Sequence, residues 1–172
     1  MKNCFEIRGE FVAIYLMRRD RSFLETIIDL EDLLKAQEVS GTWYAWWCKN
    51  TRSYYAVTHA PKGEKISTIY LHRWIMGTPS ELRGDHRNHD TLLNTRENLR
   101  NVTIAVNNQN LGLSCANRSG ARGVTWHKPS QKWRARIGLN NKDMHLGLFD
   151  DINQAAQVAH EARIKYMPGY VY

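Results

Sequence analysis

The chain has 172 residues, a formal net charge of +7, a hydrophobic fraction of 42% and six tryptophans. This composition excludes an intrinsically disordered chain, which would have few aromatic residues and little to bury. No apolar run approaches the ~20 residues that cross a bilayer, and the N-terminal MKNCFEIRGEF lacks the apolar core of a signal peptide. We therefore expect an intracellular, soluble protein without a membrane partner.

The positive charge is distributed unevenly. Residues 116–172 contain nine Lys and Arg against four Asp and Glu. This C-terminal third is the expected electrostatic anchor for a polyanion. The three cysteines are scattered and form no CxxC pair, so they indicate neither a structural zinc site nor a disulfide framework.

The N-terminal region alternates between strand and helix patterns. Residues 3–17 predict two short strands interrupted near Gly9, and the second, at 11–16, is apolar on both faces as in a buried strand. Residues 25–38 predict a short helix with one acidic face. The apolar face of this helix would consist of Ile27, Leu30, Leu33 and Leu34.

Aromatic residues dominate the next segment. Residues 42–48 and 53–58 predict paired strands, whose aromatic side chains either pack in a core or stack on nucleic-acid bases. Residues 66–71 predict another strand, and residues 72–76 a short helix that ends near Gly77.

A group of residues suited to phosphodiester hydrolysis lies within residues 71–110. Asp85 and Asn107 offer hard oxygen donors for a divalent cation. His86 belongs to the residue type whose unperturbed pKa, about 6.5, suits a general base near neutral pH. Asn98 offers a group to orient its imidazole. Adjacent Asp and His residues also occur in ordinary surface or capping roles, so this alternative stays open.

This segment resembles the HNH endonucleases, which have the ββα-metal fold, and is most similar to the phage-type homing endonucleases. The matching residues are His72-Arg73, Asp85-His86, Asn94, Asn98-Leu99, Val102-Thr103 and Asn107. The resemblance implies His86 as general base, and Asp85 with Asn107 as ligands of one Mg²⁺ or Mn²⁺ per active site. It also implies that Asn98 braces the two strands and orients the histidine. Leu93 stands where relatives often carry Asn or Asp.

The motif residues imply a local order of elements. Residues 84–95 are expected to form the first strand, a loop and the start of the second strand. Asn98 then leads into residues 99–103, and a helix carrying Asn107 follows. His89 and Asp90 are expected to be solvated loop residues, with extra metal ligands as the alternative.

A small polar stretch at residues 112–120 reads as a linker, and a second pattern follows it. In KWRARIGL, Trp133, Ala135 and Ile137 alternate with three basic residues, which predicts a strand with one apolar face. Asn140-Asn141 is typical of a hairpin turn. A third strand at 144–149 and a helix complete the pattern, with Asp150 or Asp151 as the helix cap. Within this helix Ile152, Ala155, Ala159, Ala162 and Tyr166 repeat at helical spacing.

This C-terminal pattern resembles the AP2 DNA-binding domain, in which a three-stranded sheet backed by one helix enters the DNA major groove. The landmarks are Arg122-Gly123-Val124, Lys132-Trp133, Arg136-Ile137, Leu146-Gly147-Leu148-Phe149-Asp150 and Ala155-Ala156. The resemblance implies a DNA-binding face of Lys132, Arg134 and Arg136, with Arg122, Thr125 and His127 beside it on the first strand. Thr125 stands where plant members often have Arg. An ordinary solvated basic face is the alternative.

Together these features predict an α+β protein of two domains. An HNH nuclease domain with a β-rich extension would occupy 1–111, a linker 112–120 and an AP2-like domain 121–172. The expected function is a metal-dependent DNA endonuclease, similar to homing endonucleases, that nicks double-stranded DNA. If the protein is phage-encoded, it would act in the host cytoplasm. Monomer and dimer both remain open. The alternatives are a non-enzymatic DNA-binding regulator and a phage accessory or structural protein, each built on a degenerate nuclease domain.

Overall fold

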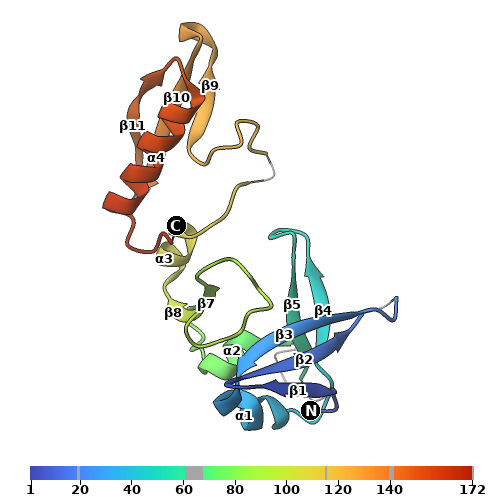
Figure 1. The fold of residues 1–172 in the computed structure, drawn as a ribbon. Coiled ribbons are helices and arrows are strands. Elements are labelled where there is room, and N and C mark those ends of the chain that lie inside the picture. Colours follow the sequence, from blue (N-terminus) through green and yellow to red (C-terminus); the bar gives the residue numbers. More distant parts are fainter. Residues whose placement is uncertain (19, 61–67, 115, 140–141, 172) are drawn as a thin grey trace. The chain divides into compact units, whose positions relative to one another are not determined.

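The computed structural model describes residues 1–18, 20–60, 68–114, 116–139 and 142–171. The chain forms two compact units, Met1–Ile104 and Ala105–Tyr172. Both combine mostly antiparallel strands with helices, which confirms the predicted α+β class (Figure 1). Within the described residues, no helix has the length and apolar character needed to cross a membrane.

The first unit is built on a six-stranded sheet in which one strand, β2, pairs with three others. Its strands are β1 (Phe5–Arg8), β2 (Phe11–Met17), β3 (Phe23–Asp29), β4 (Tyr44–Cys48), β5 (Ser53–His59) and β6 (Thr68–Tyr70). Strand β2 pairs with both β1 and β3, and a single parallel pair, Met17 with Tyr44, joins it to β4. The two strands on either side of Gly9 and the aromatic pair β4–β5 confirm the predictions for these segments. The predicted start of β6, at residue 66, lies outside the described residues.

The helix predicted for residues 25–38 is largely wrong. Residues up to Asp29 belong to β3, a 3-10 turn (η1, Leu30–Asp32) follows, and helix α1 covers only Leu33–Gln37. The run Thr26-Ile27-Ile28 is β-branched and favours a strand. Thr26 and Ile28 are both fully buried. Leu34, expected on the apolar face, is 77% exposed.

The core of the first unit lies between the sheet, α1 and helix α2 (Leu71–Met76). Its largest fully buried side chain is Trp43. The other buried core residues are Val12, Ile14, Leu16, Ile28, Ala36, Val39, Ala56, Leu71, Ile75 and Leu99. Helix α2 ends at Gly77, whose φ of 53° is left-handed, as the sequence predicted.

A two-stranded antiparallel hairpin follows α2. It consists of β7 (Arg83–His86) and β8 (Leu99–Val102), and helix α3 (Ile104–Gln109) comes after it. The order strand, strand, helix matches the expectation. The second strand starts at Leu99 rather than by residue 95, because the twelve residues before it form a loop held by side-chain hydrogen bonds.

The second unit is a three-stranded antiparallel sheet with one helix. Its elements are β9 (Val124–His127), the short 3-10 turn η2 (Lys128–Ser130), β10 (Lys132–Leu139), β11 (Lys142–Phe149) and α4 (Ile152–Tyr166). The Asp151 carboxylate accepts a hydrogen bond from the Asn153 N–H (3.0 Å), which identifies the helix cap. The predicted Asn140-Asn141 turn lies outside the described residues.

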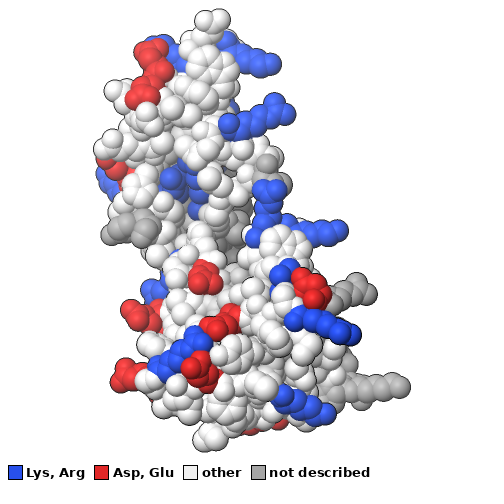
Figure 2. Space-filling model, turned by 45° about the vertical axis from the view of Figure 1, so that its right-hand side comes forward, with Lys and Arg blue, Asp and Glu red and all other residues white. Residues whose placement is uncertain are grey.

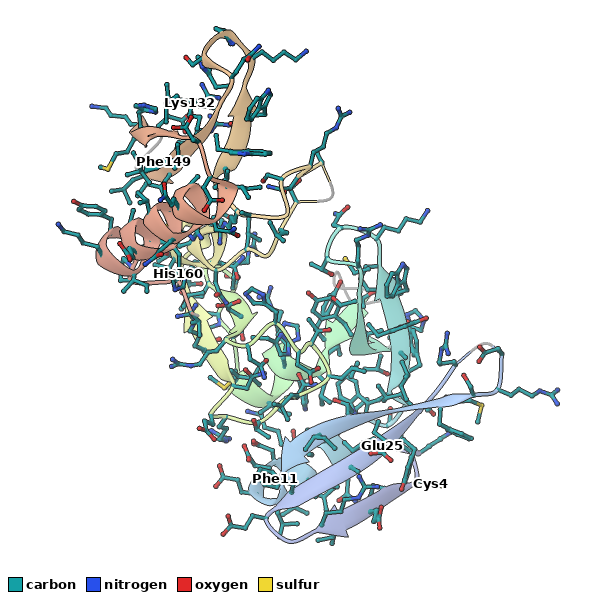
Figure 3. All side chains as sticks on the ribbon, turned by 45° about the horizontal axis from the view of Figure 1, so that its top comes forward. Cys4, Phe11, Glu25, Lys132, Phe149 and His160 are labelled. Carbon is teal, nitrogen blue, oxygen red and sulfur yellow. The ribbon has the colours of Figure 1, made fainter. Side chains whose placement is uncertain are left out.

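Helix α4 covers one face of this sheet with a row of small side chains. Ala155 and Ala159 pack with Val124 and Ala135, and Phe149 at the end of β11 joins them (Figure 3, which also labels His160 on α4). The pairing of β10 with β11 contains a bulge, where the register shifts between Ala135 and Arg136. The opposite face of the sheet is not part of this core and carries the basic residues.

Candidate active site and nucleic-acid face

The hairpin β7–β8 places the two central motif residues at the end of β7. His86 is 5% exposed, and its ring meets that of His72 on α2 edge to face, with centroids 4.8 Å apart. An added Cβ on Gly84 would lie 2.6 Å from His72 Cδ2. A glycine at this position therefore lets α2 pack its histidine directly on the strand.

A buried asparagine holds the imidazole of His86. His86 Nε2 lies 3.0 Å from Asn94 Oδ1, and the Asn94 amide donates from Nδ2 to Thr26 Oγ1 (2.7 Å). The Thr26 hydroxyl itself donates to the Leu92 carbonyl (2.7 Å). With the amide oriented in this way, Oδ1 is an acceptor and Nε2 carries the proton. The lone pair that can take up a proton is then on Nδ1.

The environment keeps both histidines neutral. Burial lowers the pKa of His86, while the hydrogen bond to Asn94 and the charges of Asp85 and Asp90 oppose this shift. Burial lowers the pKa of His72 much further, and neighbouring His86 and Arg73 act in the same direction. A neutral His86 at physiological pH has the protonation state that a general base requires.

Asn98 has a different task from the one expected. Its Oδ1 accepts from the Asn88 N–H (3.1 Å) and its Nδ2 donates to the Leu93 carbonyl (2.8 Å). It therefore braces the loop between the strands, while Asn94 makes the contact with the imidazole. The prediction that Asn98 orients His86 is corrected in this respect. Asn94 lies within the matched motif, but neither its spacing nor its residue type distinguishes it from Asn98 as the partner of the histidine.

Strand β3 fixes the loop from its far side. The Ile27 N–H donates to the Leu92 carbonyl (2.9 Å), and the Asn94 N–H donates to the Ile27 carbonyl (2.7 Å). The residue that binds the histidine is thus held through its main chain as well as its side chain. His89 and Asp90 are exposed loop residues, as expected.

Asp85, the predicted metal ligand, forms an ion pair across the hairpin. Arg100 stands directly opposite in the β7–β8 register, and its Nε and Nη2 lie 2.8 and 2.7 Å from Asp85 Oδ2. These two side chains are only 11% and 14% exposed. Sequence reasoning missed this arginine, although the register of a two-stranded hairpin would have pointed to it.

The predicted metal pair spans the two compact units. Asp85 belongs to the first, whereas Asn107 is a half-buried residue of α3 in the second, so their pairing stays a prediction. Carboxylate and amide oxygens suit a hard divalent cation in their chemistry. Across the described parts of the chain, no group of three or more His, Cys, Asp or Glu side chains is arranged to hold a metal ion.

The open face of the second sheet carries the predicted DNA-binding residues. Thr125 and His127 on β9 stand opposite Arg134 and Lys132 on β10. Arg136 follows at the next outward position, with His145 of β11 facing it, a neighbour that sequence reasoning missed. The alternation predicted for β10 is confirmed, because Ala135 and Ile137 are buried on the side of α4. In Figure 2, Lys and Arg side chains (blue) project from the second unit.

Exposed ion pairs engage two of these cations. Lys132 Nζ lies 3.0 Å from Asp150, and Arg136 pairs with Asp143. Such exposed pairs contribute little and exchange readily for another anion. Between them, Thr125 Oγ1 and Arg134 Nε are buried without a hydrogen-bond partner among the residues that the structure describes.

Arg122 does not lie on this face, which corrects the prediction. It precedes β9, and its Nη1 and Nη2 donate to the carbonyls of Gln109 (2.8 Å) and Asn108 (3.1 Å) at the end of α3. The next residue, Gly123, has a left-handed φ of 80°, and an added Cβ there would lie 2.4 Å from the Arg136 carbonyl oxygen, so this turn requires glycine.

Comparisons of the chain with models of protein families, with curated proteins and with solved structures gave no match.

Proposed function

We propose that the protein is a metal-dependent DNA endonuclease of the HNH type. The observation that carries the proposal is the buried, neutral His86, held by Asn94 and adjacent to Asp85 on the hairpin β7–β8. The succession of this hairpin and α3 supports the ββα-metal assignment. The sheet β9–β11 backed by α4 supports an AP2-like unit that binds double-stranded DNA.

In the proposed reaction, His86 acts as the general base. Its Nδ1 accepts a proton from the water that attacks the phosphorus, while Asn94 keeps the proton on Nε2. The negative charges of Asp85 and Asp90 stabilise the imidazolium that forms. Bound through Asp85 and Asn107, Mg²⁺ or Mn²⁺ would stabilise the charge on the leaving 3′ oxygen. One base makes one active site, so a monomer would nick a single strand.

The second unit would supply most of the affinity. A β-sheet is narrow enough to enter the DNA major groove, and this unit would place its open sheet face there in the manner of β-sheet readers. The buried Arg134 Nε and Thr125 Oγ1 are polar atoms without a partner among the described residues, as expected at a surface that is completed by a ligand. The loose ion pairs of Lys132 and Arg136 would exchange their carboxylates for phosphates.

A non-enzymatic DNA-binding regulator is the second candidate. The Asp85–Arg100 ion pair and the burial of His86 favour it, because both motif residues already have protein partners. Both candidates use the same DNA-binding face. They differ only in whether the first unit hydrolyses DNA.

A plasmid-nicking assay with Mg²⁺, with Mn²⁺ and with EDTA separates the two. The endonuclease should convert supercoiled into open-circular DNA with either metal, should stop in EDTA and should lose activity in His86→Ala. His89→Asn is the matched control, because His89 is an exposed histidine of the same loop with a left-handed φ of 66° that Asn tolerates. Tight DNA binding without nicking in either metal would instead establish the regulator.

A further inference from the structure

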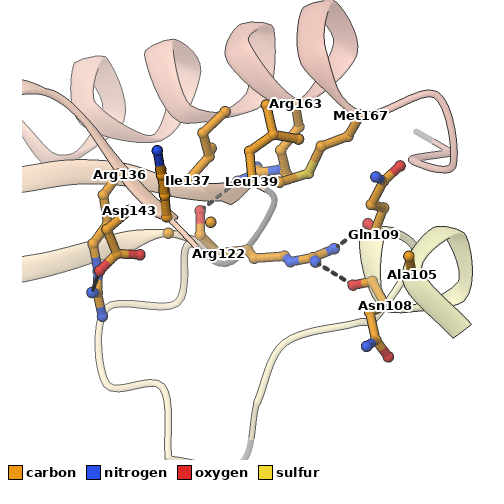
Figure 4. A pocket seen from close by; sticks show the side chains of 13 residues that line it. Ala105, Asn108, Gln109, Arg122, Arg136, Ile137, Leu139, Asp143, Arg163 and Met167 are labelled. Carbon is orange, nitrogen blue, oxygen red and sulfur yellow. Dashed lines mark hydrogen bonds and ion pairs between the residues drawn. The ribbon is translucent and has the colours of Figure 1, made fainter.

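The second unit contains a basic cleft beside its sheet. The cleft has a volume of about 1060 Å³ and lies between the end of α3, the turn at Gly123, the ends of β10 and β11, and α4 (Figure 4). Its charged lining consists of Arg122, Arg136, Lys142, Arg163 and Asp143. The lining thus contains four positive side chains and a single carboxylate, that of Asp143, which is already paired with Arg136.

Arg163 is the deepest of these residues. It is 6% exposed, its Nη1 donates to the Arg122 carbonyl (2.7 Å), and its Cζ lies 5.1 Å from the centre of the Tyr170 ring. Its Nε is buried and has no hydrogen-bond partner among the described residues. A buried, charged donor without an acceptor is unfavourable. The guanidinium therefore lacks an acceptor on the side of this atom.

Arg122 and Arg163 are held close together with the same sign of charge. Burial lowers the pKa of Arg122, and the neighbouring charge of Arg163 lowers it further. Neither forms an ion pair with a carboxylate in the described parts of the chain. The carbonyls at the end of α3 carry only partial negative charge and offset part of this repulsion. A cleft with such charges focuses its positive potential on an incoming anion.

We propose that this cleft binds a phosphate oxyanion between Arg122, Arg163 and Lys142. Arg163 offers its unpartnered Nε–H as a charged donor, Arg122 contributes its positive charge, and the exposed Lys142 adds a point charge. Arg136 belongs both to the cleft and to the open face of the sheet. A DNA strand on that face can therefore continue to the cleft, so its backbone is the assigned source of the phosphate. This assignment rests on the proposed function, whereas the anion site does not.

The test measures duplex binding by the full chain as a function of salt. Lys142→Ala and Arg122→Met should each reduce the slope of log K against log[salt] by about one, with base preference unchanged. Lys165→Ala is the matched control, because it removes an exposed lysine of α4 outside the cleft, and it should leave the slope unchanged. In parallel, the NMR signal of the Arg163 Nε–H group is followed during titration with inorganic phosphate at constant ionic strength. It should shift saturably.

The outcomes separate the two proposals. If the wild type binds and nicks DNA, but Lys142→Ala keeps its salt slope and phosphate leaves the Arg163 signal unmoved, the cleft proposal is overturned and the endonuclease stands. If the wild type neither binds nor nicks DNA, the proposed function fails and the titration alone decides. A saturable shift then supports a site for free phosphate, and an unmoved signal refutes it. Should Arg122→Met unfold, the other variant and the titration still decide.

Discussion

Replacing Asn94 by aspartate tests the proposed base most directly. Asn94 Oδ1 lies 3.0 Å from His86 Nε2, and the residue is 1% exposed. The aspartate side chain has nearly the same shape, but it places a negative charge where the amide has a neutral oxygen. An opposite charge at this distance in a buried site raises a histidine pKa by about 1–3 units. In the wild type, burial lowers the pKa of His86, so the new aspartate would raise a pKa that the wild-type environment keeps low.

The sign of the effect on activity follows from the role of a base. Only neutral His86 accepts a proton, so raising its pKa moves the acid limb of the pH–rate profile to higher pH by about 1–3 units. The exchange also removes the donation from Asn94 Nδ2 to Thr26 Oγ1, whose own proton goes to Leu92. Two oxygens would then face each other without a proton. We expect the free energy of unfolding to fall by about 1–3 kcal/mol.

The assay is single-turnover nicking from pH 5 to 9, with a urea titration of each protein to show that it is folded. Asn94→Ala is the control, because it removes the hydrogen bond without adding charge. Since that bond raises the pKa of His86, the alanine variant should keep its acid limb or move it to lower pH. An acid limb at the wild-type position in a folded Asn94→Asp protein would refute the assignment of Asn94 as the residue that controls the base.

Three further predictions concern the candidate active site and its proposed metal. His86→Ala should reduce the nicking rate by about 10²–10⁴-fold while gel-shift affinity persists, and a variant that keeps more than about a tenth of the rate would remove His86 as the base. Asp85→Ala and Asn107→Ala should each raise the Mn²⁺ concentration needed for cleavage, and an unchanged requirement in both would exclude them as ligands. Finally, the free energy of unfolding should fall from pH 7 to pH 5, because unfolded histidines take up protons near pH 6.5 while folded His72 and His86 resist protonation. His72→Gln should weaken this dependence in urea titrations, and an unchanged dependence would show that His72 does not contribute to it.

Local patterns in the sequence predicted the elements with strong periodicity. The alternation of KWRARIGL predicted β10, and the helical spacing of the alanines predicted α4. The pattern at residues 25–38 was misleading, because its leucines are spaced as in a helix while its first half is β-branched. What decides the structure there is the pairing of β3 with β2 on one side and with Leu92 and Asn94 on the other. Partners so distant in sequence leave no local signal.

The same distinction applies to the candidate site. Motif spacing placed Asp85 and His86 next to each other on a hairpin, as the structure has them. The choice between two asparagines as the partner of His86 depends on how the loop folds back against β3, which no spacing encodes. The ion pair between Asp85 and Arg100 follows from the hairpin register, which depends on where β8 begins. The roles of these residues in catalysis and metal binding remain predictions.

Helix α3 illustrates why a linker in sequence need not separate what it connects. The small polar residues 112–120 contain no helix or strand among those described, as their composition suggests. Yet Arg122, beyond them, binds the carbonyl oxygens at the end of α3, and Gln109 Oε1 accepts a hydrogen bond from the Gly169 N–H (2.9 Å). Residues 112–120 therefore form a loop whose flanking residues, at the end of α3 and at Arg122, are hydrogen-bonded to each other. Through these contacts, made by one half-buried guanidinium and one amide, α3 is fastened to the second compact unit, although its Asn107 belongs to the nuclease-like motif.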